Sequence, residues 1–110
     1  MHDPANLEFS AADMLSMGDA VLRRAVAHID ALDASPACGD FTDIEALCRH
    51  LREPEPATGM PLESLLEPLY NDWIPRSFGT PAPGYLAYIP GGGIFPAALA
   101  DFIADTSNRY

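Results

Sequence analysis

Apolar residues recur at steps of three and four over the first third of the chain, and they predict an amphipathic helix from Ala11 to Leu32. Ser10 can cap this helix, and Asp13 places a carboxylate where the helix dipole favours negative charge. The centre of the apolar stripe consists of Leu15, Gly18, Leu22, Ala25, Ile29 and Leu32. Charged residues fall largely off this stripe, so one side of the helix is expected to face solvent and the other an apolar partner.

A second, shorter helix is predicted from Thr42 to Leu51, after a break over residues 33–40. Thr42 and Glu45 have the spacing of a capping box, in which each side chain bonds to the backbone amide of the other residue. Residues 53–59 then alternate proline with other residues, and proline removes backbone donors and disfavours helix in the residue before it. This segment is therefore expected to be an extended connector that packs poorly.

A third helical face consists of Leu62, Leu65, Leu66, Leu69, Tyr70 and Trp73. Pro68 lies inside this pattern and leaves two interpretations open. The helix kinks at Pro68 because the ring removes a hydrogen bond, or a new helix begins there because proline suits a first turn. The sequence does not choose between them.

The C-terminal part begins with residues 80–90, where three prolines lie among aromatic and apolar residues, and this stretch is expected to be extended. Three glycines, Gly91 to Gly93, follow it. A last helix is predicted from Ile94 through Ile103, with Pro96 in its first turn. Neither a glycine cap nor a proline stop follows this helix, so the chain is expected to end in mid-helix.

These elements predict an all-α protein of extended helices joined by proline-rich loops, because almost no strand pattern and no internal repeat occur. The chain divides into a flexible arm (residues 1–9), a helical segment (10–79) and a C-terminal segment (80–110). The connectors are longer than the roughly two to eight residues that usually join the helices of a bundle. The helices are therefore expected to cover another surface better than they cover each other.

The net charge of the chain limits its possible partners. The 110 residues include 16 Asp and Glu and 6 basic residues, all arginine, so the net charge is −10. An acidic surface disfavours nucleic acid and anionic membrane as partners. The absence of lysine excludes a Schiff-base lysine and a P-loop lysine. The chain shows no secretory signal and no apolar run of the roughly 18 residues that a membrane span needs, so we expect a cytoplasmic protein.

No catalytic group stands out from the sequence. The histidines are scattered, without a second metal ligand at helical spacing, and Ser64 and Ser77 lack a nearby base. Cys38 and Cys48 fit no zinc or redox spacing and are expected to be reduced thiols.

Two features around the glycines have both a structural and a functional interpretation. Gly91–Gly93 before a helix can bind an anion through free amides, or can allow the close approach of backbone or ligand. Tyr85 and the stretch Tyr88–Pro90 are either ordinary packing residues or the wall of an apolar pocket with phenol groups as polar tips.

Parts of the chain resemble the N-terminal part of the pyridoxal-phosphate-dependent group II decarboxylases, which include the aromatic-L-amino-acid, histidine and glutamate decarboxylases. The stretches that carry the resemblance are Pro83–Gly93, Ala98–Ala104 and Asn108–Tyr110. The order of the upstream helices and linker, followed by Pro61–Leu66, also agrees, so the resemblance covers most of the chain. Two positions depart from it: Ala82 where many members have histidine, and Thr80 where some animal members have a substrate-contacting tryptophan.

The resemblance implies a fold-type-I homodimer in which these helices lie across the partner subunit, whereas the large α/β domain is absent from this chain. It implies that Tyr88, Ile89, Pro90 and Gly91 line the substrate side of the active site. It assigns no catalytic, cofactor-binding or metal-binding residue here, because the family's cofactor lysine and its partners lie downstream. The expected function is that of a truncated amino-acid decarboxylase fragment, which contributes dimer contacts and pocket wall, binds no pyridoxal phosphate alone and is inactive alone.

The alternative is an independent small α-helical module without enzymatic activity, which self-associates or docks a partner helix. Its contact surfaces would be the apolar stripes of Leu15–Leu32 and Leu62–Trp73. A complete enzyme is the least expected interpretation, because no nucleophile–base pair is visible in the sequence.

Overall fold

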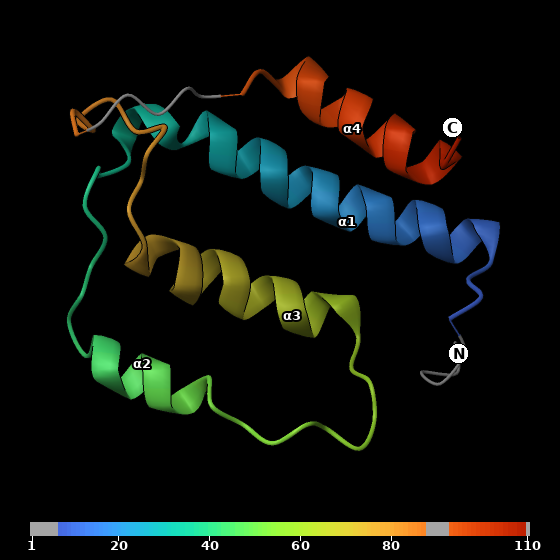
Figure 1. The fold of residues 1–110 in the computed structure, drawn as a ribbon, viewed down its shortest axis with the longest axis horizontal. Helices are drawn as coiled ribbons and strands as arrows, with labels where there is room; N and C mark the ends of the chain where they lie inside the picture. The colour runs from blue at the N-terminus through green and yellow to red at the C-terminus, as the bar shows by residue number, and fades with distance from the viewer. Residues whose placement is uncertain (1–6, 88–92, 110) are drawn as a thin grey trace.

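The computed structural model describes residues 7–87 and 93–109, and every regular element within these ranges is helical (Figure 1). This confirms an all-α fold for the described part of the chain. The elements are α1 (Ala11–Asp30), η1 (Leu32–Ala34), α2 (Ile44–His50), α3 (Leu62–Pro68), η2 (Leu69–Trp73), η3 (Ile74–Arg76) and α4 (Phe95–Ser107). None of these helices is long and apolar enough to cross a bilayer.

The long first helix forms as predicted, and its start is fixed by a reciprocal cap. The Asp13 amide donates to the Ser10 hydroxyl oxygen at 3.1 Å, and the Ser10 amide donates to the Asp13 carboxylate at 3.3 Å. Two otherwise unpaired amides at the helix N-terminus are thereby satisfied. The α-helix ends at Asp30, and Leu32 begins the short 3₁₀ turn η1 instead of completing α1.

The predicted capping box of the second helix is wrong. α2 begins after Asp43, which adopts a left-handed conformation (φ 55°), and no side chain caps the helix. Thr42 is held differently: its amide donates to the Asp40 carboxylate, and its carbonyl accepts from Arg76. Glu45 lies 3.9 Å from Arg49 instead of reaching back to Thr42.

The helical path continues through Pro68 and then widens. Pro68 keeps helical angles (φ −67°, ψ −33°) as the last residue of α3, and the next five residues form the π-helical turn η2. Proline supplies no amide for the bond one turn back, so the ladder must change pattern at this point. The 3₁₀ turn η3 completes the run at Arg76. Neither a separate second α-helix nor a simple α-helical continuation describes this segment.

Two expectations for the C-terminal part are corrected. Residues 80–85 form consecutive turns and are not extended, because the Ala82 amide donates to Gly79 and the Tyr85 amide donates to Ala82. The last helix, α4, begins as predicted with Pro96 in its first turn. It does not run out in mid-helix, since Asn108 adopts the left-handed angles of a C-terminal cap (φ 43°, ψ 52°).

The packed interior of the described residues is small. Among their apolar side chains only Leu66, 6% exposed, and Ala82, 4% exposed, are buried. The radius of gyration is 16.8 Å, whereas a compact domain of this length has about 13 Å. The exposed surface is 9238 Å², against about 5,900 Å² for a folded monomer of this mass. The helices are therefore arranged openly, with α1 and α3 in contact and α2 and α4 at the periphery (Figure 1).

Candidate functional site

The helix α1 does not turn its apolar stripe towards α3. The half-buried positions of α1 are Asp13, Met17, Ala20, Arg24, Ala25 and His28. Leu15 is 76% exposed, and Leu22 and Ile29 are each 46% exposed. At 100° per residue, the stripe lies roughly a quarter turn or more away from the side that contacts α3. We call Leu15, Leu22, Val26 and Ile29 the uncovered stripe of α1.

The last helix, α4, is exposed along its whole length. Every residue from Phe95 to Ser107 is exposed, including Phe102 at 66% and Ile103 at 63%. An isolated helix of 13 residues is marginal in water, because helix nucleation is costly. Contiguous apolar surface of this kind marks an interaction site in most proteins.

The third apolar face behaves differently and packs within the molecule. Leu66 is buried, and Leu69, Tyr70 and Trp73 are half-buried. The ring of Tyr70 meets the ring of His28 from α1 edge-on, with centroids 6.0 Å apart. Leu65 of the same face is 44% exposed. The chain itself therefore covers most, but not all, of the stripe Leu62–Trp73.

An ion pair ties α1 to α3 across the half-buried contact. Nη2 of Arg24 lies 2.7 Å from Oε2 of Glu67, and the Arg24 side chain is 30% exposed. The Asn71 side chain also donates to Glu67, at 2.6 Å. Hydrogen bonds from Arg24 and then from Asn71 hold the pKa of the Glu67 carboxyl below its ordinary value, since both stabilise the charged form.

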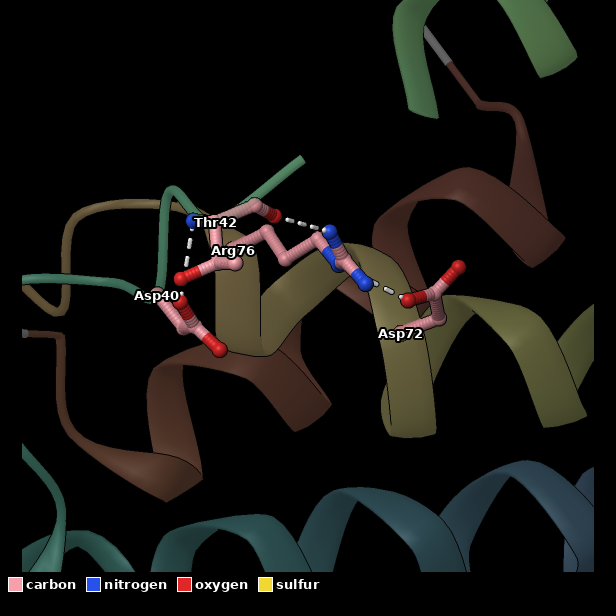
Figure 2. Close-up of polar contacts among 4 residues, drawn as sticks. All are labelled: Asp40, Thr42, Asp72 and Arg76. Carbon is pink, nitrogen blue, oxygen red and sulfur yellow. Dashed lines mark hydrogen bonds and ion pairs between the residues drawn. The ribbon is translucent and has the colours of Figure 1, made fainter. Parts of the chain in front are cut away.

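A second polar joint connects the segment before α2 to the end of η3. Figure 2 shows the Arg76 guanidinium between the Asp72 carboxylate, at 2.9 Å, and the Thr42 carbonyl, at 2.7 Å. Asp40 lies beside this arrangement and accepts from the Thr42 amide at 2.9 Å (Figure 2). Hydrogen bonds from the Thr42 side chain and amide lower the pKa of the Asp40 carboxyl.

The backbone reinforces this joint, because residues 37–40 run close beside residues 75–79. The Asp40 amide donates to Pro75 at 3.1 Å, and the Gly79 amide donates to Ala37 at 3.0 Å. A Cβ atom on Gly39 would collide with the Ser77 carbonyl oxygen, and glycine allows the approach by having none. The loop that leads towards residue 88 is thus anchored at its beginning.

Two hollows flank these joints, each of about 210 Å³. One is lined by residues of α2 and by Asp72 and Arg76. The other is lined by His28, Tyr70 and the loops around Ser35 and Ser77. Both are smaller than the roughly 300–1,000 Å³ typical of sites for organic ligands.

The hydroxyls of the second hollow are already engaged. Ser35 donates to the Ala31 carbonyl at 2.8 Å, and Ser77 donates to the Ile74 carbonyl at 2.7 Å. Neither serine is paired with a base, as a nucleophile would require. No group of three or more His, Cys, Asp or Glu side chains able to hold a metal occurs in the described part of the chain.

The four residues predicted to line a substrate pocket, Tyr88, Ile89, Pro90 and Gly91, lie outside the described residues. On the described side of this stretch, Tyr85 is half-buried and Leu86 is 90% exposed. Pyridoxal phosphate does not fit the residues of this chain as a covalently held cofactor. The sequence offers no lysine amine to form the Schiff base.

Comparison with curated proteins finds a decarboxylase as a relative. The chain is 27% identical over 105 residues to an aromatic-L-amino-acid decarboxylase of Bacillus atrophaeus. The aligned region covers 96% of this chain and 22% of that enzyme, so the chain spans about a fifth of the length of its relative. No protein-family model and no solved structure matches the chain. The similarity supports a decarboxylase-like segment.

Proposed function

We propose that this chain is the N-terminal segment of a pyridoxal-phosphate-dependent amino-acid decarboxylase. In this role it contributes contacts between two subunits and part of the wall of the substrate pocket, and it has no activity alone. The observation that carries the proposal is the uncovered stripe of α1, which is turned away from α3. The collinear similarity to a decarboxylase over 96% of the chain supports it.

The exposed area is sufficient for subunit contacts. The exposed surface of the chain exceeds that of a compact monomer by about 3,300 Å². A stable protein–protein interface needs about 800 Å² from each partner. The uncovered stripe of α1 and the side chains of α4 supply apolar residues to such an interface, and apolar burial is the main favourable term in association. The second subunit is therefore the proposed occupant of these faces.

The proposed pocket contribution rests on the stretch Tyr88–Gly91. The anchored loop before it supports this role, because the Gly79 amide is bonded to Ala37 and Ala82 is buried. A wall segment must be held at a fixed distance from the reacting atoms, since loose positioning of substrate contacts costs rate. The reacting groups themselves, including a cofactor lysine, must come from another part of the enzyme.

A chimera tests this proposal. The matched stretch of the Bacillus atrophaeus decarboxylase is replaced by the corresponding residues of this chain, and oligomeric state and carbon dioxide release from an aromatic amino acid are measured. We expect a dimer that retains decarboxylation. The same chimera with Leu22→Gln and Ile29→Gln should be largely monomeric and inactive, because polar side chains on the stripe oppose burial.

A matched chimera with Arg23→Gln controls for surface substitutions on α1, since the ion pair of Arg23 is with Asp19 on the same helix. It should behave like the unsubstituted chimera. The proposal is contradicted if the unsubstituted chimera is a folded but inactive monomer. It is also contradicted if the chimera with both glutamine substitutions remains an active dimer.

The independent helical module remains the second candidate, and the specific joint between Arg24 and Glu67 favours it. Burial of Leu66 and the ion pair between α1 and α3 both stabilise this helix pair without contacts from another domain. Amide exchange and sedimentation of the isolated chain separate the two. A protected, cooperatively unfolding monomer or small dimer supports the module, whereas weak protection and heterogeneous association support the decarboxylase segment.

A further inference from the structure

The helix α2 is attached to the rest of the molecule at one end only. It has seven residues, none of them buried, and only Ile44 and Leu47 are half-buried. On its C-terminal side, all residues from Leu51 to Pro61 are exposed. The apolar burial that normally holds a helix in place is therefore small here.

The attachments lie just before the helix, within residues 40–42. The Asp40 amide donates to the Pro75 carbonyl, and the ring of Phe41 meets that of Phe78 edge-on at 5.4 Å. The third attachment is the bond from Arg76 to the Thr42 carbonyl, at 2.7 Å. Of the three, this one alone uses a charged donor, and such hydrogen bonds are about twice as strong as neutral ones.

Asp72, four residues before Arg76 in the same helical segment, orients the Arg76 side chain for this bond. The Asp72 carboxylate accepts from Nε of Arg76 at 2.9 Å, and the Arg76 side chain is 28% exposed. The guanidinium therefore keeps its orientation without depending on α2. Asp43, next in the chain after Thr42, has left-handed angles, which are uncommon outside glycine although Asp adopts them more readily than most residues.

We propose that α2 and the connector after it open together as one unit, and that Arg76 is the latch that keeps this unit closed. Opening breaks the bond to Thr42 and unwinds α2, because a helix of seven residues without tertiary contacts is not stable in water. It leaves the bond between Arg76 and Asp72 in place. It exposes the hollow that Leu47, Asp72 and Arg76 line. This inference does not depend on the proposed decarboxylase role, since it uses only contacts within the chain.

Hydrogen exchange of the full chain, read by NMR at single amides, tests the latch. The reporters are the amides of Leu47 and Leu51, which donate within α2 to Asp43 and Leu47. In Arg76→Ala they should exchange about tenfold faster, which corresponds to the lower end of a charge-assisted hydrogen bond's net contribution. Amides in the middle of α1 should keep their wild-type rates.

Two further variants make the test specific. Arg49→Ala removes an arginine of α2 whose ion pair among the described residues is a 3.9 Å contact with exposed Glu45, and it should leave the reporters nearly unchanged. Asp72→Asn weakens the orientation of Arg76 without removing it and should accelerate the reporters by a smaller factor. In the wild type, exchange at the reporters should depend only weakly on low denaturant, as local opening does.

Three results overturn the inference. The first is that the amides of Leu47 and Leu51 exchange in Arg76→Ala at the same rates as in the wild type. The second is equal acceleration of α1 and α2, which would mean that the whole molecule unfolds. The third is a strong denaturant dependence of the reporters in the wild type, and this measurement decides the matter even if Arg76→Ala fails to fold.

Discussion

Arg24 on α1 and Glu67 on α3, which lie 43 positions apart in the chain, form an ion pair of 2.7 Å between the two helices. The pair lies on the side of α1 that packs, where small and polar residues replace the leucines and isoleucines of the uncovered stripe. It is one of the contacts that join this face of α1 to α3. The apolar face is left for another surface.

Removal of this pair should change how Glu67 titrates. The pKa of Glu67 in the folded chain lies below its unfolded value, so the stabilisation is complete above the unfolded value and is lost as pH falls through the folded pKa. Arg24→Met should raise the Glu67 pKa towards its ordinary value. The stability difference between wild type and variant should shrink as the solution is acidified. Carbon-13 NMR titration of Glu67 and denaturation at several pH values measure both effects.

The matched control for this titration is Arg23→Met. Arg23 forms its ion pair with Asp19 on the solvent side of the same helix. Its removal changes the charge of α1 equally and should leave the Glu67 pKa where it was. An equal rise of the Glu67 pKa in both variants would show that net charge, not the specific pair, sets it.

Leu66 should dominate the stability of the chain, because it is the one large side chain that is buried among the described residues. Leu66→Ala is expected to reduce the free energy of unfolding by about 2–5 kcal/mol, from lost transfer energy and a residual cavity. Leu86→Ala, at a position 90% exposed, should stay within about 0.5 kcal/mol of wild type. Urea denaturation followed by circular dichroism compares them, and similar losses in the two variants would contradict this packing.

Two glycine substitutions should act in opposite directions. Gly39→Ala places a methyl group against the Ser77 carbonyl, where the backbone must move, and is expected to cost about 1–3 kcal/mol. Gly18→Ala meets nothing within 4 Å in the middle of α1 and should stabilise the helix by about 1 kcal/mol. Thermal unfolding of both variants shows whether each substitution raises or lowers stability. If Gly39→Ala does not lower stability, residues 37–40 do not approach residues 75–79 so closely.

The cap at the end of α4 gives a third comparison. Asn108 has left-handed angles, which glycine adopts freely and a residue with an ordinary Cβ adopts at a cost of about 1–2 kcal/mol. Asn108→Gly should therefore preserve or raise the helicity of residues 101–107, and Asn108→Ala should lower it. Cα chemical shifts report this directly. Equal shifts in the two variants would mean that α4 ends without a left-handed residue.

Local signals predicted the helices well. The cap formed by Ser10 and Asp13, the period of the α1 stripe and the position of Pro96 all act within a few residues, so the sequence reveals them. Thr42 does not cap α2, because its amide is taken by Asp40 and its carbonyl by Arg76. The bond to Asp40 spans two residues, as in an Asx turn, and a local rule could have found it. Arg76 lies 34 residues away, and no local rule anticipates it.

The sequence pattern also could not predict which face of α1 contacts α3. Periodicity finds the apolar stripe of α1, but it does not say that α3 contacts the flank that carries Arg24 and His28. The role of Arg76 had a weak signal, since Asp72 lies four residues before it at the spacing of a helical ion pair. The predicted pocket residues Tyr88–Gly91 stay a prediction, outside the described residues.

The wide turn η2 gives the helical run after Leu62 one spare residue. A π-helical turn holds one residue more than an α-helical turn, so deletion of one residue between Leu69 and Trp73 would restore regular winding and leave the following residues facing nearly the same way. Arg76 would then still point towards Thr42. Deletion of one residue within α3, where no turn holds an extra residue, would instead rotate Arg76 by about 100° relative to the start of that helix. Single deletions should consequently be tolerated in η2 and in the open connector 51–61, where loop length costs little, and should disrupt the structure in α3.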